Sequence, residues 1–376
     1  MDDPGFSTAE SRRIFGLENR LRKMLEVEAA LAAATAAAGL IPSGAAAKIE
    51  EVCREEGFDA AAVFARGWED GSPVIPLVSR LRQLAGEDAA AFVHLGATSQ
   101  DVIDTGLVLQ VRDGLAVLEG RLLSIGRGLT ALAEGHRDSL MTGRTLMQPA
   151  APITFGLAVA TWLDSLTRDV ERLRERRRGA ALQLGGPAGT LAGFGGRGLQ
   201  VAEEMGRLLS LAVPAVPWHS TRDRIGEVAA ALALAARTAA KVAGDVVLLA
   251  QGEVGEVSTR AGGSSSMAAK RNPIDAIRAV AAAQVASGQA AVLLDVRPCE
   301  LQRAAGAWQA EWAAVPALFH ATLAACEALG RTVASLEVDD QRMRANLAQG
   351  VPGDQDAGLA GELVDRAVAA FRKLER

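Results

Sequence analysis

Apolar residues recur at helical spacing along almost the whole of this 376-residue chain, and this periodicity restricts the fold more than any other feature. The chain contains no tyrosine and only 4% aromatic residues, while alanine and leucine are abundant. Helices favour alanine and leucine, whereas strands favour β-branched and aromatic residues. No convincing strand alternation is present. The sequence therefore predicts an all-α fold.

Several of the periodic segments approach or exceed 25 residues, a length typical of long helical bundles. Helices are predicted over residues 14–38, 74–84, 102–133, 153–178, 199–212, 224–253, 273–294, 300–329, 338–347 and 358–374. We expect an N-terminal helical domain (1–103), a central long-helix bundle (104–335) and a short C-terminal helical segment (336–376). Alanine-rich faces at 228–236 and 279–286 indicate burial inside an oligomeric bundle, although packing within one chain would also explain them.

The composition argues against several classes of function. A net charge of −5 does not favour nucleic acid as a partner. The most apolar stretch, 228–250, contains three charged residues and predicts a buried helix, not a membrane span. The N-terminus is acidic and lacks a signal-type apolar run. We therefore expect a cytoplasmic protein.

The cysteines and histidines of the chain do not occur at the short spacings that are typical of metal-binding sites. The three cysteines are far apart, odd in number and without a CxxC pair, which is typical of reduced thiols in a cytosolic protein. The four histidines are equally dispersed. No metal site is predicted.

A run of two glycines and three serines at 262–266 is the most informative motif for function. It is followed by Lys270, Arg271 and Asn272-Pro273. Asn is favoured as a helix N-cap and Pro at the first helical position, so a helix is predicted to begin here. Hydroxyls, a lysine and the positive end of a helix suit carboxylate binding and carbanion stabilisation. A surface linker would have the same composition.

Three further segments combine polar and cationic residues just before predicted helices. Residues 94–101 (HLGATSQD) offer hydroxyls that can cap a helix or hold an anion. Residues 143–149 (GRTLMQP) place an arginine beside a hydroxyl and an amide, or form a turn with a surface arginine. Residues 218–224 (WHSTRDR) hold a titratable ring and two guanidinium groups, or a capped helix start with a His219–Asp223 contact. None of the three segments is specific alone.

Taken together and in this order, the four segments resemble the fumarase/aspartase superfamily, whose signature loop reads GSSxMPxKxNP. Within that superfamily the chain is most similar to the bacterial 3-carboxy-cis,cis-muconate cycloisomerases. The similarity is carried by residues 94–105 (HLGATSQDVIDT), 183–191 (QLGGPAGTL), 218–225 (WHSTRDRI) and 303–312 (RAAGAWQAEW). It extends from about residue 15 to residue 347.

The resemblance implies a homotetramer whose active sites each draw on three subunits and need no cofactor. The reaction would close one carboxylate of 3-carboxy-cis,cis-muconate onto a carbon–carbon double bond, giving a lactone in the breakdown of protocatechuate. In reverse, this is a β-elimination through a carbanion next to a carboxylate, which needs several preorganised positive groups.

Residue roles also follow from the resemblance. Ser264 and Lys270 match the catalytic positions, with Ser264 handling the carbon-bound proton. Lys270 and Asn272 would bind the carboxylate next to the reacting carbon. Thr98 and Ser99 would contact a second carboxylate. The remaining candidates for substrate binding are His94, Gln100, Arg144, Thr145, Gln148, His219, Arg222, Ser265, Met267 and Arg303.

The chain departs from the superfamily pattern at several positions. Leu146 and Pro149 stand where related enzymes carry a histidine, which argues against adenylosuccinate lyase because an amine leaving group needs a proton. Ala268 replaces the signature proline. About 30 residues follow Leu347, so the third domain is predicted to be reduced. Two other functions stay open, namely a lyase that releases fumarate and a catalytically silent helical oligomer.

Overall fold

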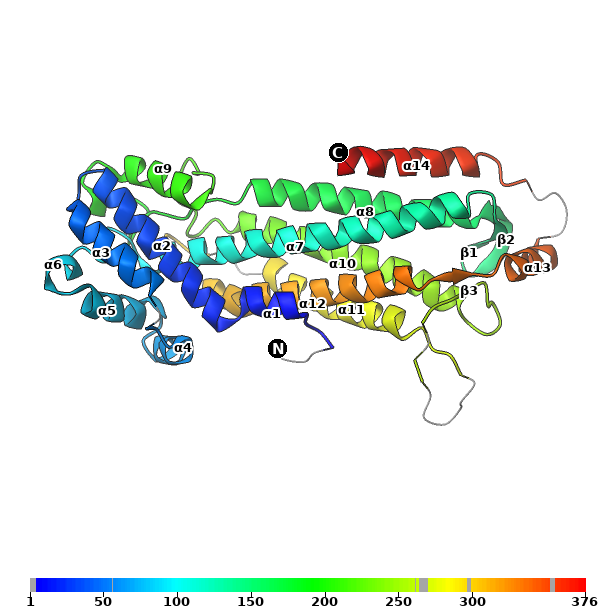
Figure 1. The fold of residues 1–376 in the computed structure, drawn as a ribbon, viewed down its shortest axis with the longest axis horizontal. Coiled ribbons are helices and arrows are strands. Elements are labelled where there is room, and N and C mark those ends of the chain that lie inside the picture. Colours follow the sequence, from blue (N-terminus) through cyan, green and yellow to red (C-terminus); the bar gives the residue numbers. More distant parts are fainter. Residues whose placement is uncertain (1–4, 56, 261, 264–269, 296–298, 352–355) are drawn as a thin grey trace.

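The structure is a computed structural model that describes residues 5–55, 57–260, 262–263, 270–295, 299–351 and 356–376. Helices dominate these residues, which confirms the predicted all-α fold. The molecule is elongated, with its long helices running along its length (Figure 1).

Long helices from the middle of the chain build the central bundle. They are α7 (Ser99–Gly135), α8 (Phe155–Arg178), α10 (Asp223–Leu249), α11 (Ile274–Leu294) and α12 (Ala307–Ala334). Most contribute large apolar side chains that are almost fully buried, such as Leu115, Leu163 and Val242. At 1.5 Å per residue, the 37 residues of α7 span roughly 55 Å. The two ends of the bundle are therefore far apart.

Shorter helices pack around one end of this bundle (Figure 1). They are α2 (Leu17–Ala37), α3 (Ser43–Arg54), α4 (Ala60–Glu69), α5 (Val74–Ala85), α6 (Glu87–Ala90) and α9 (Gly198–Leu209), with the 3-10 turn η1 (Ala192–Phe194) before α9. Helix α1 (Ala9–Phe15) lies instead along the middle of α7 and α12. The predicted single helix over 14–38 is wrong, because the chain breaks at Gly16 between α1 and α2. The short helices α3, α4 and α6 were not predicted.

Two C-terminal helices complete the fold. Helix α13 (Asp340–Gly350) lies against β1, and α14 (Ala360–Glu375) runs along α8 and α7. The buried ring of Phe371 sits where a Cβ on Gly126 would lie only 2.3 Å from it, so α14 packs closely on α7. The proposed division into three domains stays a prediction.

The expectation that no strands occur is wrong in one place that matters for function. Strands β1 (Leu140–Thr145) and β2 (Gln148–Thr154) form an antiparallel hairpin between α7 and α8. Leu146 and Met147 join them with φ angles of 49° and 67°, as a two-residue hairpin turn requires. The strands lack alternating polarity, and β2 contains two prolines, so no strand signal is present in these residues. A second pair, β3 (Val257–Ser258) and β4 (Glu337–Val338), is shorter.

Helices α11 and α12 are long and apolar enough to cross a membrane by length and composition alone. Core helices of soluble proteins pass the same test. The most apolar window of α12 is 72% buried inside the chain, whereas that of α11 is only 33% buried. Helix α11 therefore leaves much of an apolar face uncovered in a single chain.

Candidate active site

The candidate residues lie in two groups at opposite ends of the bundle (Figure 1). At the start of α7, termed the His219 end, lie His94, Thr98, Ser99, Gln100, His219, Arg222 and Arg303. At the far end, termed the hairpin end, lie Arg144, Thr145, Gln148, Lys270 and Asn272. Ser264, Ser265, Met267 and Ala268 lie outside the described residues. No single chain can bring the two groups together, because α7 separates them by roughly 55 Å.

The N-terminus of α7 is organised by Asp101, whose side chain is almost fully buried. Thr98 is the N-cap, one of the two hydroxyl residues that could cap this helix, and its backbone N–H donates to Oδ2 of Asp101 at 3.0 Å. The backbone N–H groups of Gly185 and Gly186 each donate to the same carboxylate at 2.9 Å. Asp101 therefore fixes the glycine-rich loop against the start of α7.

His219 is a fourth close partner of this carboxylate. Its Nε2 lies 2.7 Å from Oδ1 of Asp101, and the residue is 4% exposed. The contact replaces the His219–Asp223 pairing considered from the sequence. A Cβ on Gly185 would lie 2.8 Å from Cε1 of His219, so only glycine leaves room for the ring.

Two candidates at this end are already engaged within the chain. The amide of Gln100 donates to the backbone carbonyl of His219 at 2.8 Å and to Oδ2 of Asp104 at 3.2 Å. Arg222 makes two hydrogen bonds to Asp104, at 2.7 and 3.0 Å, and further bonds to Glu311. Burial works to lower the pKa of Arg222, but the two carboxylates outweigh it and the pKa is raised. Arg222 thus holds the site together and has little left to offer a substrate.

Arg303 has no such carboxylate partner among the described residues. Its Nη2 donates to Oγ1 of Thr98 at 2.8 Å and to the carbonyl of Pro187 at 3.4 Å, and the side chain is exposed. The backbone N–H groups of Ser99 and Gln100 lie at the same helix start. A guanidinium beside the positive end of a helix is well suited to a carboxylate.

His94 lies near this point and is engaged within the chain. Its Nδ1 lies 2.6 Å from Oε1 of the buried Glu28. Burial alone would lower the pKa of His94, but the charge and hydrogen bond of Glu28 outweigh it and the pKa is raised. Like Arg222, His94 therefore already has a carboxylate partner in its own chain.

At the hairpin end, Arg144 is bound to a carboxylate of its own chain. Its two terminal nitrogens lie 2.9 and 2.6 Å from the oxygens of Glu256, which is fully buried. Asn346 donates to the same carboxylate at 2.8 Å. Arg144 therefore fastens the hairpin to the segment before β3 and to α13.

The tip of the hairpin projects into solvent. Thr145 and Gln148 are exposed and pair across the turn, while Leu146 and Met147 are 96% and 64% exposed. An apolar tip of this kind is expensive to leave in water. Burial of the tip against a neighbouring molecule would remove that cost.

The signature loop is closed at its base by the described residues on either side. The N–H of Gly262 donates to the carbonyl of Asn272 at 3.0 Å. The predicted N-cap role of Asn272 is wrong, because α11 begins at Ile274 with Pro273 in the cap position. Proline cannot cap through its side chain, so the β-bridge fixes the helix entry instead. Lys270 is exposed.

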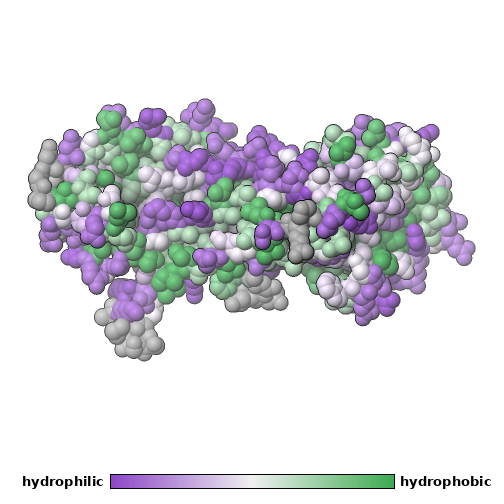
Figure 2. All heavy atoms as spheres, turned by 180° about the vertical axis from the view of Figure 1, so that it is seen from behind, coloured by the Kyte–Doolittle hydropathy of each residue, from purple (hydrophilic) through white to green (hydrophobic). Residues whose placement is uncertain are grey.

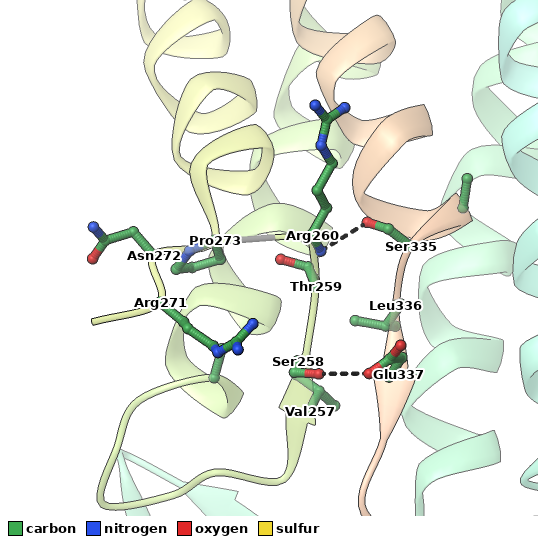
Figure 3. A pocket seen from close by; sticks show the side chains of 12 residues that line it. Val257, Ser258, Thr259, Arg260, Arg271, Asn272, Pro273, Ser335, Leu336 and Glu337 are labelled. Carbon is green, nitrogen blue, oxygen red and sulfur yellow. Dashed lines mark hydrogen bonds between the residues drawn. The ribbon is translucent and has the colours of Figure 1, made fainter. Parts of the chain in front are cut away.

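A cavity of about 460 Å³ lies beside this loop base, between it and the β3–β4 pair. Figure 3 shows Arg271 extending toward Ser258, while the amide of Asn272 points away from Ser258 and Glu337. Ser258 donates to Oε2 of Glu337 at 3.1 Å. Asn272 thus presents its amide to the outside of the chain, where a neighbouring molecule could approach.

Sequence reasoning missed the buried carboxylates that position the site, namely Glu28, Asp101, Asp104, Glu256 and Glu311. Asp101 and Asp104 did carry a signal, since they lie three residues apart on an otherwise apolar helix. Within the described residues, no three His, Cys, Asp or Glu side chains gather closely enough to hold a metal ion.

Comparison with known proteins decides the family. A family model described as Lyase matches residues 6–287. The chain belongs to this lyase family, within the fumarase/aspartase superfamily. A lyase-family relative from Pseudomonas aeruginosa, named 3-carboxy-cis,cis-muconate cycloisomerase, is 45% identical over 353 residues, covering 92% of this chain and 77% of the relative.

Two further matches agree with this one. A relative of the same name from Bradyrhizobium diazoefficiens is 43% identical over 352 residues, covering 92% of this chain and 78% of its own length. The crystal structure of 3-carboxy-cis,cis-muconate lactonizing enzyme from Pseudomonas putida superposes with a TM-score of 0.92 at 34% identity. The match covers 100% of this chain and 99% of that one. The resemblance drawn from the motifs is confirmed.

Proposed function

We propose that this lyase-family protein closes 3-carboxy-cis,cis-muconate to a carboxymuconolactone as a cofactor-free cycloisomerase, in protocatechuate breakdown. The observation that carries the proposal is the Arg303 guanidinium, which donates to Thr98 at the start of α7 and has no carboxylate partner among the described residues. The proposal is supported by the cycloisomerase relatives, which are 45% and 43% identical to this chain. The substrate has three carboxylates, and the His219 end offers the Arg303 guanidinium and helix N–H groups to one of them.

The reaction forms one bond between a carboxylate oxygen and a carbon of the double bond. The electron pair of that double bond then moves to the neighbouring carbon, next to a second carboxylate, and takes up a proton. Lys270 is the proposed counter-charge for the electron-rich intermediate. Ser264 is the proposed proton donor by its match to the family loop. The attacking carboxylate is already ionised at neutral pH, so no base is needed for it.

The separation of the two residue groups supports a homotetramer with shared sites. Thr98, Ser99 and Arg303 at one end can meet Lys270 and Asn272 only if these come from different chains. Exposed apolar residues on α10 and α11 offer the surface for such contacts, and Figure 2 shows hydrophobic residues at the surface in several places along the molecule. The larger of these are Leu234, Leu248, Ile277, Val280, Val292 and Leu294.

The activity test is direct. Purified protein is mixed with 3-carboxy-cis,cis-muconate, and loss of the conjugated-diene absorbance is followed together with lactone formation. Absence of turnover with the wild type would refute the proposal. Fumarate release from argininosuccinate or adenylosuccinate, with no muconate turnover, would instead show a fumarate-releasing lyase.

Shared sites are tested by complementation. Ser264→Ala and Arg303→Met each damage every site of a homotetramer. After the two impaired proteins are unfolded together and refolded, some sites combine an intact Ser264 with an intact Arg303. We expect part of the wild-type activity to return. No recovery, despite mixed tetramers detected by mass spectrometry, would contradict sharing.

The remaining expectations stay predictions from composition. They are a cytoplasmic location and the absence of nucleic-acid and membrane partners.

A further inference from the structure

A groove of about 520 Å³ lies beside the first turns of α12, and none of the candidate active-site residues lines it. It is formed where α2, α4 and the first turns of α12 meet. Its lining includes three aromatic side chains, Phe64, Trp68 and Trp312, beside the guanidinium of Arg20. This volume is typical of small-molecule sites.

Arg20 is the unusual member of this groove. Its guanidinium carbon lies 4.9 Å from the centre of the Phe64 ring and 5.5 Å from that of Trp312. No ion pair or side-chain hydrogen bond joins it to any described residue. Burial lowers the pKa of Arg20 to about 10, and no carboxylate of the described residues counteracts this. Arg20 is half-buried, and a cation partly withdrawn from water without a carboxylate partner is costly, a cost that cation–π contacts offset only in part.

A second donor in the same groove also lacks a partner. The indole Nε1 of Trp312 is buried and has no hydrogen-bond acceptor among the described residues. Buried N–H groups are nearly always paired in folded proteins. Arg20 and Trp312 thus leave two kinds of donor facing an acceptor that the described part of the chain does not supply.

The apolar wall of the groove is exposed to solvent. Trp68 is 78% exposed and lies four residues after Phe64, on the same face of α4. Leu17 and Pro73 continue this surface, and Leu17 is 47% exposed. The groove therefore combines a flat aromatic wall with an unneutralised positive group at its base.

We propose that this groove is a second ligand site, which binds a small molecule with one carboxylate and a planar, aromatic body. The carboxylate accepts hydrogen bonds from Arg20 and from Nε1 of Trp312, and the ring packs against Trp68 and Phe64. The ligand also meets Gly306 and Gln309, directly after the segment that carries Arg303. This inference does not depend on the proposed reaction.

Benzoate is the probe, titrated into the full-length protein by calorimetry in the presence of saturating tricarballylate, a tricarboxylate that occupies the active site. We expect saturable binding that weakens at least about tenfold in Arg20→Met, because a charge-assisted hydrogen bond is lost. Arg13→Met, at an exposed arginine on α1, and Arg303→Met are expected to bind benzoate as the wild type does. Benzyl alcohol, which lacks the charge, is expected to bind at least about tenfold more weakly.

Arg20→Met is expected to fold, since it replaces a half-buried cation that lacks a carboxylate partner among the described residues with an apolar side chain of similar length. If it does not fold, a crystal of the wild type soaked in benzoate gives the same answer through the position of the bound molecule. Equal affinity in folded Arg20→Met, or benzoate found only elsewhere, would overturn the proposal. So would no saturable binding below about 10 mM, which corresponds to a free energy weaker than roughly 3 kcal/mol.

Discussion

Nε2 of His219 lies 2.7 Å from Oδ1 of Asp101, although 118 residues separate the two in the chain. The same carboxylate accepts backbone N–H groups from Thr98, Gly185 and Gly186. One buried side chain therefore sets the positions of the α7 N-terminus, the glycine-rich loop and the histidine. This contact brings the residue 94–101 and 218–224 segments together within one chain.

Replacing that carboxylate is expected to damage both stability and activity. In Asp101→Asn the amide nitrogen cannot accept, so at least one buried N–H is left without a partner. We expect a loss of about 2–3 kcal/mol in the free energy of unfolding, measured with urea, and a fall in kcat/KM. Asp88→Asn, at an exposed aspartate, is the matched control. An unchanged unfolding midpoint in Asp101→Asn would show that the carboxylate does not organise this end.

The pairing of His94 with Glu28 predicts a pH dependence of stability. Burial lowers the pKa of His94, but Glu28, with help from Asp101, outweighs burial and the opposing charge of Arg82, so the pKa is raised in the folded state. The pair's contribution is then fully present below the unfolded value of about 6.5 and is lost as pH rises through the folded pKa. The stability difference between wild type and His94→Asn should therefore shrink as pH rises above about 6.5.

Asn tolerates the positive φ of 63° at this position, so the backbone need not rearrange. The measurement is urea unfolding of both proteins between about pH 5.5 and 8.5. The control repeats the comparison without the carboxylate. The stability difference between Glu28→Gln and the double variant His94→Asn, Glu28→Gln should not shrink as pH rises. A stability difference that grows as pH rises would show that the histidine is not held in its charged form.

Arg303 is expected to act on substrate binding. Arg303→Met removes a guanidinium that is free to grip a carboxylate, and kcat/KM should fall about 10- to 100-fold with 3-carboxy-cis,cis-muconate. Arg303→Lys keeps the positive charge but not the paired N–H donors of the guanidinium, so its loss in kcat/KM should be smaller. The free energy of unfolding should change little in either variant because the side chain is exposed. Arg13→Met controls for the loss of one positive charge.

Arg144 is expected to act on stability instead. Arg144→Met leaves the fully buried Glu256 without its cation and should cost about 3 kcal/mol. The double variant Arg144→Met, Glu256→Leu should recover much of that loss. A urea-unfolding double-mutant cycle measures the coupling. Additive losses in the cycle would show that the pair is not coupled, and Arg144 would again be a candidate substrate ligand.

Much of the fold could be predicted from local patterns in the sequence. The boundaries of α7, α8, α10, α11 and α14 lie within about four residues of the predicted ones, because long amphipathic repeats encode long helices. The β1–β2 hairpin could not be predicted in this way. Its strands lack alternation, and the positive φ angles at Leu146 and Met147 are imposed by the turn and not by residue preference.

The amino-acid sequence by itself determined the helical class and the family resemblance, because these depend on spacing and residue type within short segments. Only the tertiary structure decided which cations stay free. Arg144 and Arg222 are bound to buried carboxylates distant in sequence, whereas Arg303 has no carboxylate partner in the part of the chain that the structure describes. Charge pairing over such separations depends on how the helices pack, and no local pattern records it.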